Sequence, residues 1–342
     1  MASPTVAQPS EKEGGPRSPG QILLGWAERY ALVMGLAALI VFFAVWPKTS
    51  DTFLTTINIQ NVLATQAVIS IAAIAVLVPL VCGEFDISVG AVLGLSTYAV
   101  ASALEHSFPL ILGILVGIAI TAVIGAVIGW IVAYLKANSI IITLGAATLV
   151  TGLVSLYSHN QSIVGVPQPL AEFGGGLTLG IPRPTWVLIV VALLVWYMLR
   201  FTVYGRQLLM VGSSARAAQL VGVRTKRVVF TAFLLSATLA GVAGVVGLAR
   251  AGSATPEIGP GYTLPAVAAV FLGSTTIRPG QFNVPGTIVG VFFVAVTVNG
   301  LTLAGTADWV DPVFNGAAVI VAVSVSTLLL NRRGGRGRVA GS

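Results

Sequence analysis

Residues 110–135 read LILGILVGIAITAVIGAVIGWIVAYL, a stretch without a single charged side chain. A helix needs about 20 apolar residues to cross the roughly 30 Å hydrocarbon core of a bilayer, and this stretch exceeds that length. In lipid, every backbone N–H and C=O must find its partner within the segment or within a closed barrel. The stretch therefore predicts a membrane-spanning α-helix.

The whole chain is likewise rich in apolar residues and poor in charged ones. Of its 342 residues, 56% are apolar and 8% are charged, against about 25% charged in a soluble domain. We therefore expect an all-α, polytopic transmembrane helical bundle of about ten spans. The expected spans are residues 31–46, 62–81, 91–104, 110–135, 140–157, 186–199, 228–249, 264–277, 287–303 and 313–330.

The placement of basic residues orients this bundle, because Lys and Arg near spans collect on the cytoplasmic side. With a cytoplasmic N-terminus, only Lys48, Arg183 and Arg250 of the 18 basic residues fall outside. We therefore expect a multi-pass membrane protein with both termini in the cytoplasm. The net charge of +7 is then a topological signal, and no nucleic-acid partner is expected.

The expected organisation has a disordered cytoplasmic tail, 1–22, a transmembrane domain, 23–331, and a basic cytoplasmic tail, 332–342. Residues 158–184 are expected to form an irregular outer loop, and residues 200–227 a basic cytoplasmic loop. Residues 60–160 and 228–330 are expected to be repeats. Five crossings separate them, so they would be inverted, as in many transporters.

Small residues recur every four positions along residues 110–135. Gly113, Gly117, Thr121, Gly125 and Gly129 fall on one helical face, where a neighbouring helix can approach closely. We interpret this face as a packing surface. The glycines at 241, 244 and 247 are expected to act in the same way.

Acidic side chains inside apolar segments are costly, at about 2.5 to 3.5 kcal/mol for an ionised carboxylate on insertion scales. Glu84 and Asp86 are the two candidates, at the break that Gly83 opens between two spans. Asp86 or Ser88 would cap the next helix. A role of Glu84, Asp86 and Ser88 in the transport pathway is the alternative, and the two roles are compatible.

Uncharged polar side chains within the spans are the other pathway candidates. Amides and hydroxyls there could bind a hydroxylated solute, although they also join helices to one another. These candidates are Gln66, Ser70, Thr143, Asn299 and Asn315.

No catalytic or metal-binding set is visible. The chain has neither an HExxH nor a GxSxG motif, no Cys/His cluster and only one cysteine, Cys82. It also lacks the GxxxxGK[ST] phosphate loop. We therefore expect no enzyme activity and no cofactor in this chain, with ATP and Mg²⁺ held by a partner if ATP drives it.

Four motifs stand out in the chain: GEFDISVG at 83–90, IITLG at 141–145, GSSARAAQLVGV at 212–223 and the stretch 261–273. Together they resemble the motifs of the membrane-spanning permeases of bacterial sugar ABC importers, the ribose permease group. This resemblance implies a protein of the bacterial cytoplasmic (inner) membrane, with residues 23–331 as its permease domain. The resemblance runs from about residue 53 to residue 330. Glu84, Arg216, Thr263 and Pro265 depart from the ribose pattern, so ribose itself is not implied.

The resemblance implies a short cytoplasmic helix that docks into a cleft of a separate ABC ATPase. The positions that match it are Gly212, Arg216, Ala217, Ala218, Leu220 and Gly222. The alternative is a basic loop that obeys the charge rule alone.

The resulting hypothesis is a permease subunit that imports a sugar or polyol. Its partners would be an ATPase subunit, an extracytoplasmic solute-binding protein, a second permease subunit, expected to be another copy of this chain, and the lipid bilayer. The alternatives are an ABC permease for branched-chain amino acids or another small solute, and a secondary transporter or channel. A membrane enzyme is the third rival and lacks a catalytic set.

Overall fold

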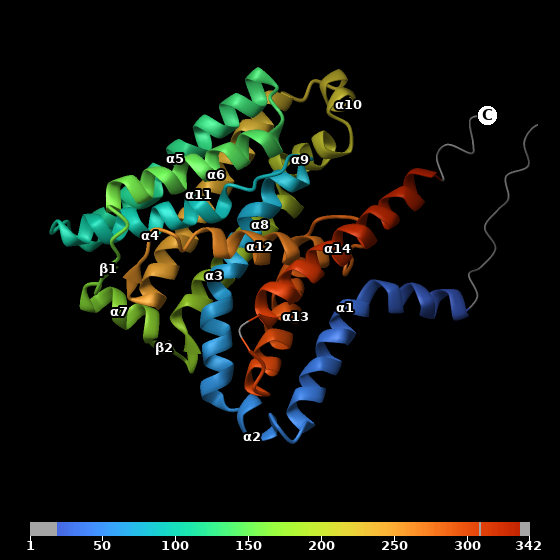
Figure 1. The fold of residues 1–342 in the computed structure, drawn as a ribbon. Coiled ribbons are helices and arrows are strands. Elements are labelled where there is room, and N and C mark those ends of the chain that lie inside the picture. The colour runs from blue at the N-terminus through green and yellow to red at the C-terminus, as the bar shows by residue number, and fades with distance from the viewer. Residues whose placement is uncertain (1–18, 308, 336–342) are drawn as a thin grey trace, which may run out of the picture.

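The computed structural model describes residues 19–307 and 309–335, and these residues are mostly helical (Figure 1). The long helices are α1 (Pro19–Val45), α3 (Thr56–Val81), α4 (Val89–Glu105), α5 (Leu110–Leu135), α6 (Ser139–Ser158), α8 (Arg183–Phe201), α11 (Thr225–Ala251), α12 (Pro260–Gly273), α13 (Val284–Leu303) and α14 (Val310–Gly335). The shorter elements are α2 (Ser50–Phe53), β1 (Ile163–Val164), α7 (Gln168–Gly175), β2 (Leu177–Thr178), β3 (Ile181–Pro182), α9 (Val203–Ser213), α10 (Ala215–Leu220) and β4 (Ser253–Ala254).

Each of the ten predicted apolar segments coincides with one of the ten long helices, although the segment 264–277 runs past the end of α12 at Gly273. Within the described residues, six helices are long and apolar enough to cross a membrane: α3, α5, α6, α8, α11 and α13. At 1.5 Å per residue, α12 is only about 21 Å long. The helical bundle is thus confirmed, while ten full crossings are not.

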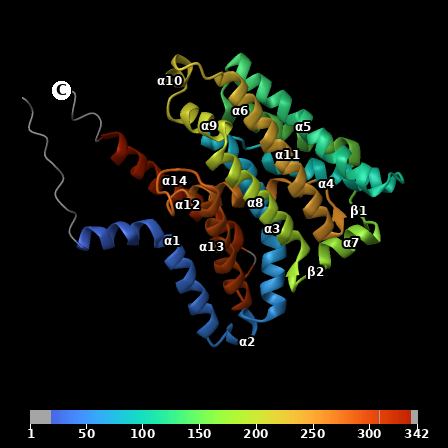
Figure 2. The ribbon, with the colours of Figure 1, turned by 180° about the vertical axis from the view of Figure 1, so that it is seen from behind.

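The centre of the bundle is formed by α3 and α11, which pack against each other. On one side α11 packs against α4 and α5, and on the other α3 packs against α12 and α13 (Figures 1 and 2). Most of α3 from Ala67 to Leu80 is buried, with Ile71, Ile74 and Leu77 fully so. Because α3 is apolar all round from Ala67 onward, apart from Ser70, this half is suited to the central position.

The predicted small-residue face of α5 packs against α4 and α11. A side chain at Gly117 would meet Val100 of α4, and one at Gly129 would meet Phe230 and Phe233 of α11. Gly241 of α11 in turn lies against Thr121. The packing interpretation of both glycine sets is confirmed.

Gly125→Ala is expected to lower the free energy of unfolding by about 1–3 kcal/mol, because a Cβ there would overlap Ala237 and lie 2.7 Å from the Phe233 carbonyl oxygen. Gly145→Ala on α6 is the matched control, since no atom lies within 4 Å of its added Cβ. Thermal unfolding in detergent measures both. Equal midpoints for the two variants would show that α5 and α11 are not in close contact.

The starts of α4 and α12 also touch. A Cβ at Gly90 would overlap Thr263 and lie 2.5 Å from the Gly259 carbonyl oxygen, and one at Gly259 would lie 2.5 Å from the Gly90 carbonyl oxygen. Glycine at both positions therefore lets the two helix starts meet inside the bundle.

Three boundaries differ from the sequence predictions. The helix α1 begins at Pro19, within the tail expected at 1–22, and residues 1–18 of that tail lie outside the described residues. The basic tail expected from 332 begins within α14, which ends at Gly335, and residues 336–342 also lie outside. The loop 158–184 is more regular than expected: it contains α7, and β1 pairs with β4 after α11.

Candidate functional site

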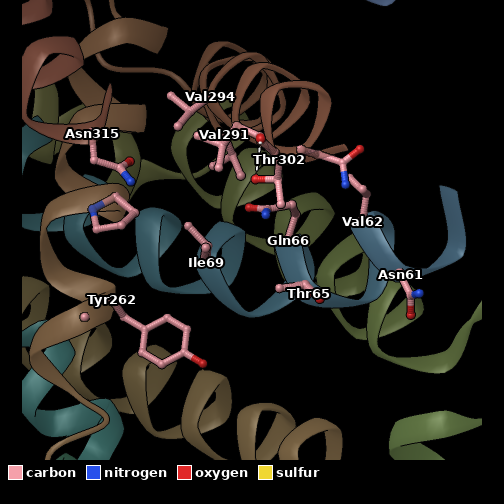
Figure 3. A pocket seen from close by; sticks show the side chains of 15 residues that line it. Asn61, Val62, Thr65, Gln66, Ile69, Tyr262, Val291, Val294, Thr302 and Asn315 are labelled. Carbon is pink, nitrogen blue, oxygen red and sulfur yellow. Dashed lines mark hydrogen bonds between the residues drawn. The ribbon is translucent and has the colours of Figure 1, made fainter. Parts of the chain in front are cut away.

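A cavity of about 480 Å³ lies between α3, α12, α13 and α14 (Figure 3). This volume falls within the range of small-molecule sites, about 300–1,000 Å³. Apolar walls alternate with amide and hydroxyl groups. The lining residues are Asn61, Val62, Thr65, Gln66, Ile69, Gly261, Tyr262, Pro265, Val291, Val294, Ala295, Val298, Asn299, Thr302 and Asn315.

The polar groups of this cavity are neutral amides, hydroxyls and one phenol. No Asp, Glu, Lys, Arg or His is among the described residues that line it. Asn299 is held by a reciprocal amide pair with Asn58, with N–O distances of 3.0 and 3.1 Å. The Thr302 hydroxyl donates to the Val298 carbonyl, 2.9 Å away (Figure 3). Groups of this kind can donate to and accept from the hydroxyls of an uncharged solute.

The first turn of α12 forms part of the cavity wall. Gly261, Tyr262 and Pro265 line the cavity, and no side chain caps the helix start at Gly259. Pro260 has no N–H to donate, and the Tyr262 N–H is already bonded to the Gly259 carbonyl at 3.0 Å. Tyr262 therefore contributes the polar side chain of this turn to the cavity.

Three of the predicted pathway residues come together in this cavity: Gln66, Asn299 and Asn315. Ser70, one turn beyond Gln66 on α3, does not line it. Its buried hydroxyl has no hydrogen-bond partner among the described residues. Other polar residues of the cavity were not singled out from the sequence, and only a known cavity reveals them: Asn61, Thr65, Tyr262 and Thr302.

The other predicted pathway residues form a separate group around the break between α3 and α4. Asp86 is 2% exposed. Its carboxylate accepts from the Ser88 backbone N–H (3.0 Å) and hydroxyl (2.6 Å), and from the Ser236 hydroxyl of α11 (2.8 Å). Asp86 thus closes the turn before α4 and ties it to α11. The predicted capping of α4 by Asp86 or Ser88 is wrong, because no side chain caps the start of this helix and Asp86 bonds instead to Ser88, before its first residue. Glu84 is partly exposed.

The backbone of this break is bonded to α6. The Phe85 N–H donates to the Ser139 hydroxyl (3.1 Å), and the Ile87 N–H donates to Thr143 (3.2 Å). The Phe85 ring also stacks on Phe271 of α12, at 5.6 Å between centroids. Thr143 is thus fully buried as part of the support of the break and not of the cavity.

The predicted docking segment contains a short helix, α10, preceded by a second helix, α9, that the sequence did not reveal. The Ser214 hydroxyl caps α10 by accepting from the Ala217 N–H (3.2 Å). Ala218 is buried, whereas Leu220 and the following Val221 are 84% and 72% exposed. Arg216, Ala217 and Gly222 are also exposed. The segment therefore presents an apolar tip.

Gly212 lies on the opposite side of this segment, against the end of α3. A Cβ at Gly212 would overlap the Val81 carbonyl oxygen and lie 3.2 Å from Cys82 Cα. Gly83, with a φ of +87°, begins the break directly after these residues. The segment that carries α10 is thus in direct contact with the break that Asp86 and Thr143 support.

Comparison with known proteins gives the family. Residues 58–323 match the family described as branched-chain amino acid transport system / permease component. This chain belongs to that family of permeases. The permease is 34% identical over 319 residues to a probable ABC transporter permease of Escherichia coli (strain K12), covering 93% of this chain and 96% of the relative. The resemblance that the sequence motifs indicate is thereby confirmed.

Two further relatives of the permease are named after a sugar. The ribose import permease of Escherichia coli (strain K12) is 32% identical over 294 residues, 85% of this chain and 92% of the relative. The L-arabinose ABC transporter permease of Azospirillum brasilense is 29% identical over 294 residues, 86% and 87% of the two chains. These relatives are transport permeases and not enzymes. No solved structure matches the permease.

Proposed function

We propose that the permease imports an uncharged sugar or polyol through the cavity between α3, α12, α13 and α14. The observation that carries this proposal is the lining itself, which offers amides and hydroxyls but no ionisable side chain other than the Tyr262 phenol within the described residues. The sugar names of the ribose and arabinose relatives support it.

The same lining argues against the alternatives. A branched-chain amino acid carries an ammonium and a carboxylate, and burying them without charged partners costs several kcal/mol. A secondary transporter needs an ion- or proton-binding group on its route. The buried acid of the described residues, Asp86, lies in the break between α3 and α4 and is bonded to Ser88 and Ser236 away from the cavity.

Reconstituted vesicles test the proposal. The permease, its ATPase and its binding protein would be supplied with labelled ribose, arabinose, an inositol or leucine. ATP-dependent uptake of one of the neutral polyhydroxylated solutes is expected, without uptake of leucine. Uptake of leucine alone, or uptake that persists without ATP, would contradict the proposed function.

We propose that α10 docks into the ATPase and that Gly212, Arg216, Ala217, Ala218, Leu220 and Gly222 form the coupling segment. ATP and Mg²⁺ are bound by that partner and not by this chain. The exposed Leu220 and Val221 support this role, because exposed apolar side chains on a cytoplasmic loop are suited to a protein partner.

Leu220→Asp with Val221→Asp is expected to weaken ATPase binding at least about tenfold, because two apolar contacts are replaced by carboxylates that the interface would have to desolvate. Co-purification and the binding affinity in detergent measure this loss. Leu179→Asp, at a loop leucine that is 87% exposed, is the matched control. Equal affinities of the two variants and the unmodified permease would exclude docking through the tip of α10.

The contact of Gly212 with α3 supports a route by which the force of ATPase closure reaches the membrane helices. A displacement of α10 would be passed through α9 to Val81 and the break at Gly83. From the break, the displacement would reach α11 through the hydrogen bond between Asp86 and Ser236. It would reach α6 through the hydrogen bond between the Ile87 N–H and Thr143. Glu84, Asp86, Ser88 and Thr143 are then proposed as parts of the moving break and not as solute ligands.

Inverted repeats would give the membrane helices two alternative arrangements around the solute path. We propose that α3, α4, α5 and α6 correspond to α11, α12, α13 and α14 in opposite orientation. The pattern of helix contacts supports this. In the first pair of matching contacts, α11 packs on α4 and α5 as α3 packs on α12 and α13. In the second, α4 packs on α6 as α12 packs on α14.

The remaining parts of the proposal follow from the resemblance and the charge distribution. They are ten crossings of the bacterial inner membrane, cytoplasmic termini, an extracytoplasmic binding protein, and a second permease subunit, proposed to be another copy of this chain.

A further inference from the structure

A second, smaller cavity lies where α8 ends, at the opposite end of α3 from the solute cavity. Its volume is about 120 Å³, and it is enclosed by the ends of α3 and α8, by α9 and by the loop between α12 and α13. Arg200 and Arg278 line it together with Trp196 and Gln281. Its apolar wall consists of Val81, Leu199, Leu209, Ile277, Phe282, Val284 and Pro285.

The surroundings of this cavity carry the features of a membrane–water boundary. Trp196, Tyr197 and Phe201 are exposed on the last turns of α8, and the Phe201 ring contacts both others at 5.3 and 5.4 Å between centroids. The preceding Leu193 and Leu194 are exposed as well. Aromatic rings concentrate at the depth of lipid headgroups, next to apolar surface that faces the acyl chains.

The charged side chains that line this cavity are both basic. Both Arg200 and Arg278 are exposed, and no Asp or Glu is among the described residues of the lining. Neither guanidinium has a carboxylate partner within the part of the chain that the structure describes. Guanidinium groups bind phosphate oxygens by paired hydrogen bonds. The absence of a nearby acid disfavours a headgroup that carries an ammonium.

We propose that this cavity binds the phosphodiester of an anionic phospholipid, with Arg200 and Arg278 on the phosphate and Trp196 beside the glycerol. Basic pockets between membrane helices are a known kind of lipid site. The apolar wall accommodates the start of an acyl chain. Because Val81 and Leu209 belong to this wall, the lipid contacts both α3 and α9 at the proposed coupling junction.

Native mass spectrometry of the whole permease in detergent tests this proposal, with phosphatidylglycerol and phosphatidylcholine added in turn. Arg200→Gln with Arg278→Gln is expected to lower the retention of phosphatidylglycerol by roughly thirty-fold, at about 1 kcal/mol for each lost charge. Retention of phosphatidylcholine should change little. Lys136→Gln with Arg224→Gln, at two exposed residues, removes the same charge away from the cavity and should retain phosphatidylglycerol as the unmodified permease does.

Arg200→Lys with Arg278→Lys keeps the charge and is expected to restore most of the retention, which separates binding from a folding defect. Equal loss in both Gln pairs would overturn the proposal, since it would show a diffuse charge effect. Displacement of the lipid by millimolar inorganic phosphate would identify a free-anion site and would also overturn it. The proposal would also be overturned if Arg200→Gln with Arg278→Gln left lipid retention unchanged but abolished ATPase binding in lipid-free detergent. That result would indicate that the two arginines bind an acidic surface of the partner.

Discussion

Gln66→Leu is expected to lower solute uptake by about ten- to one-hundred-fold, with little effect on the amount of folded permease. Gln66 lines the cavity, and a leucine of similar size leaves a solute hydroxyl without its partner. An unmade hydrogen bond of this kind costs about 1–3 kcal/mol. Initial uptake rates in vesicles, measured over a range of solute concentrations, give the size of the loss.

Gln60→Leu is the matched control, because Gln60 lies on the same helix outside the cavity. Its amide donates to the Gly180 carbonyl at 3.0 Å on the surface. This control should transport at the normal rate and should keep the specificity of the permease. Equal uptake by the Gln60 and Gln66 variants would show that the solute does not pass Gln66.

Asp86→Ala is expected to destabilise the permease by about 3 kcal/mol and to abolish uptake. The substitution leaves the Ser88 N–H and the Ser88 and Ser236 hydroxyls without their acceptor in a buried place. Each buried donor without a partner costs about 1–3 kcal/mol. The midpoint of thermal unfolding in detergent is expected to fall accordingly.

Asp86→Asn separates the shape of this residue from its charge. Its carbonyl oxygen can still accept from Ser88, and its amide can donate to the Ser236 oxygen. We expect a stability within about 1 kcal/mol of the unmodified permease and near-normal uptake. An Asn variant that is equally stable but does not transport would show that the negative charge itself acts on the route.

The sequence was sufficient to predict most of the fold. Uncharged segments of this length, such as residues 110–135, can cross lipid as single helices, so the helices were found. The errors at the ends range from none for α5 to twelve residues at the start of α1, which begins at Pro19 and was expected from residue 31. The glycines of α5 predicted close contacts, because a stripe of small residues has little other use. The helices α7 and α9 were missed, since they lie in loops with little apolar periodicity.

The candidate site was predicted only in part, because the depth of a polar residue in a span does not tell which neighbour it faces. Gln66 and Asn299 line the cavity, whereas Thr143 supports the break and Ser70 is buried in the packing of α3. The docking of Gly212 on the ATPase stays a prediction, whereas its contact with Val81 was not foreseen. Such contacts join residues far apart in sequence, and no local pattern encodes them.

Protection of an introduced cysteine tests the solute cavity most directly. Cys82, the one native cysteine, is replaced by serine, and Thr65→Cys is placed on the cavity wall. Thr178→Cys, on the exposed strand β2, is the control. A membrane-impermeant thiol reagent then modifies each variant of the assembled transporter, with and without the transported sugar. We predict that the sugar slows modification at position 65 and not at position 178, whereas equal rates with and without sugar at position 65 would contradict a solute site in this cavity.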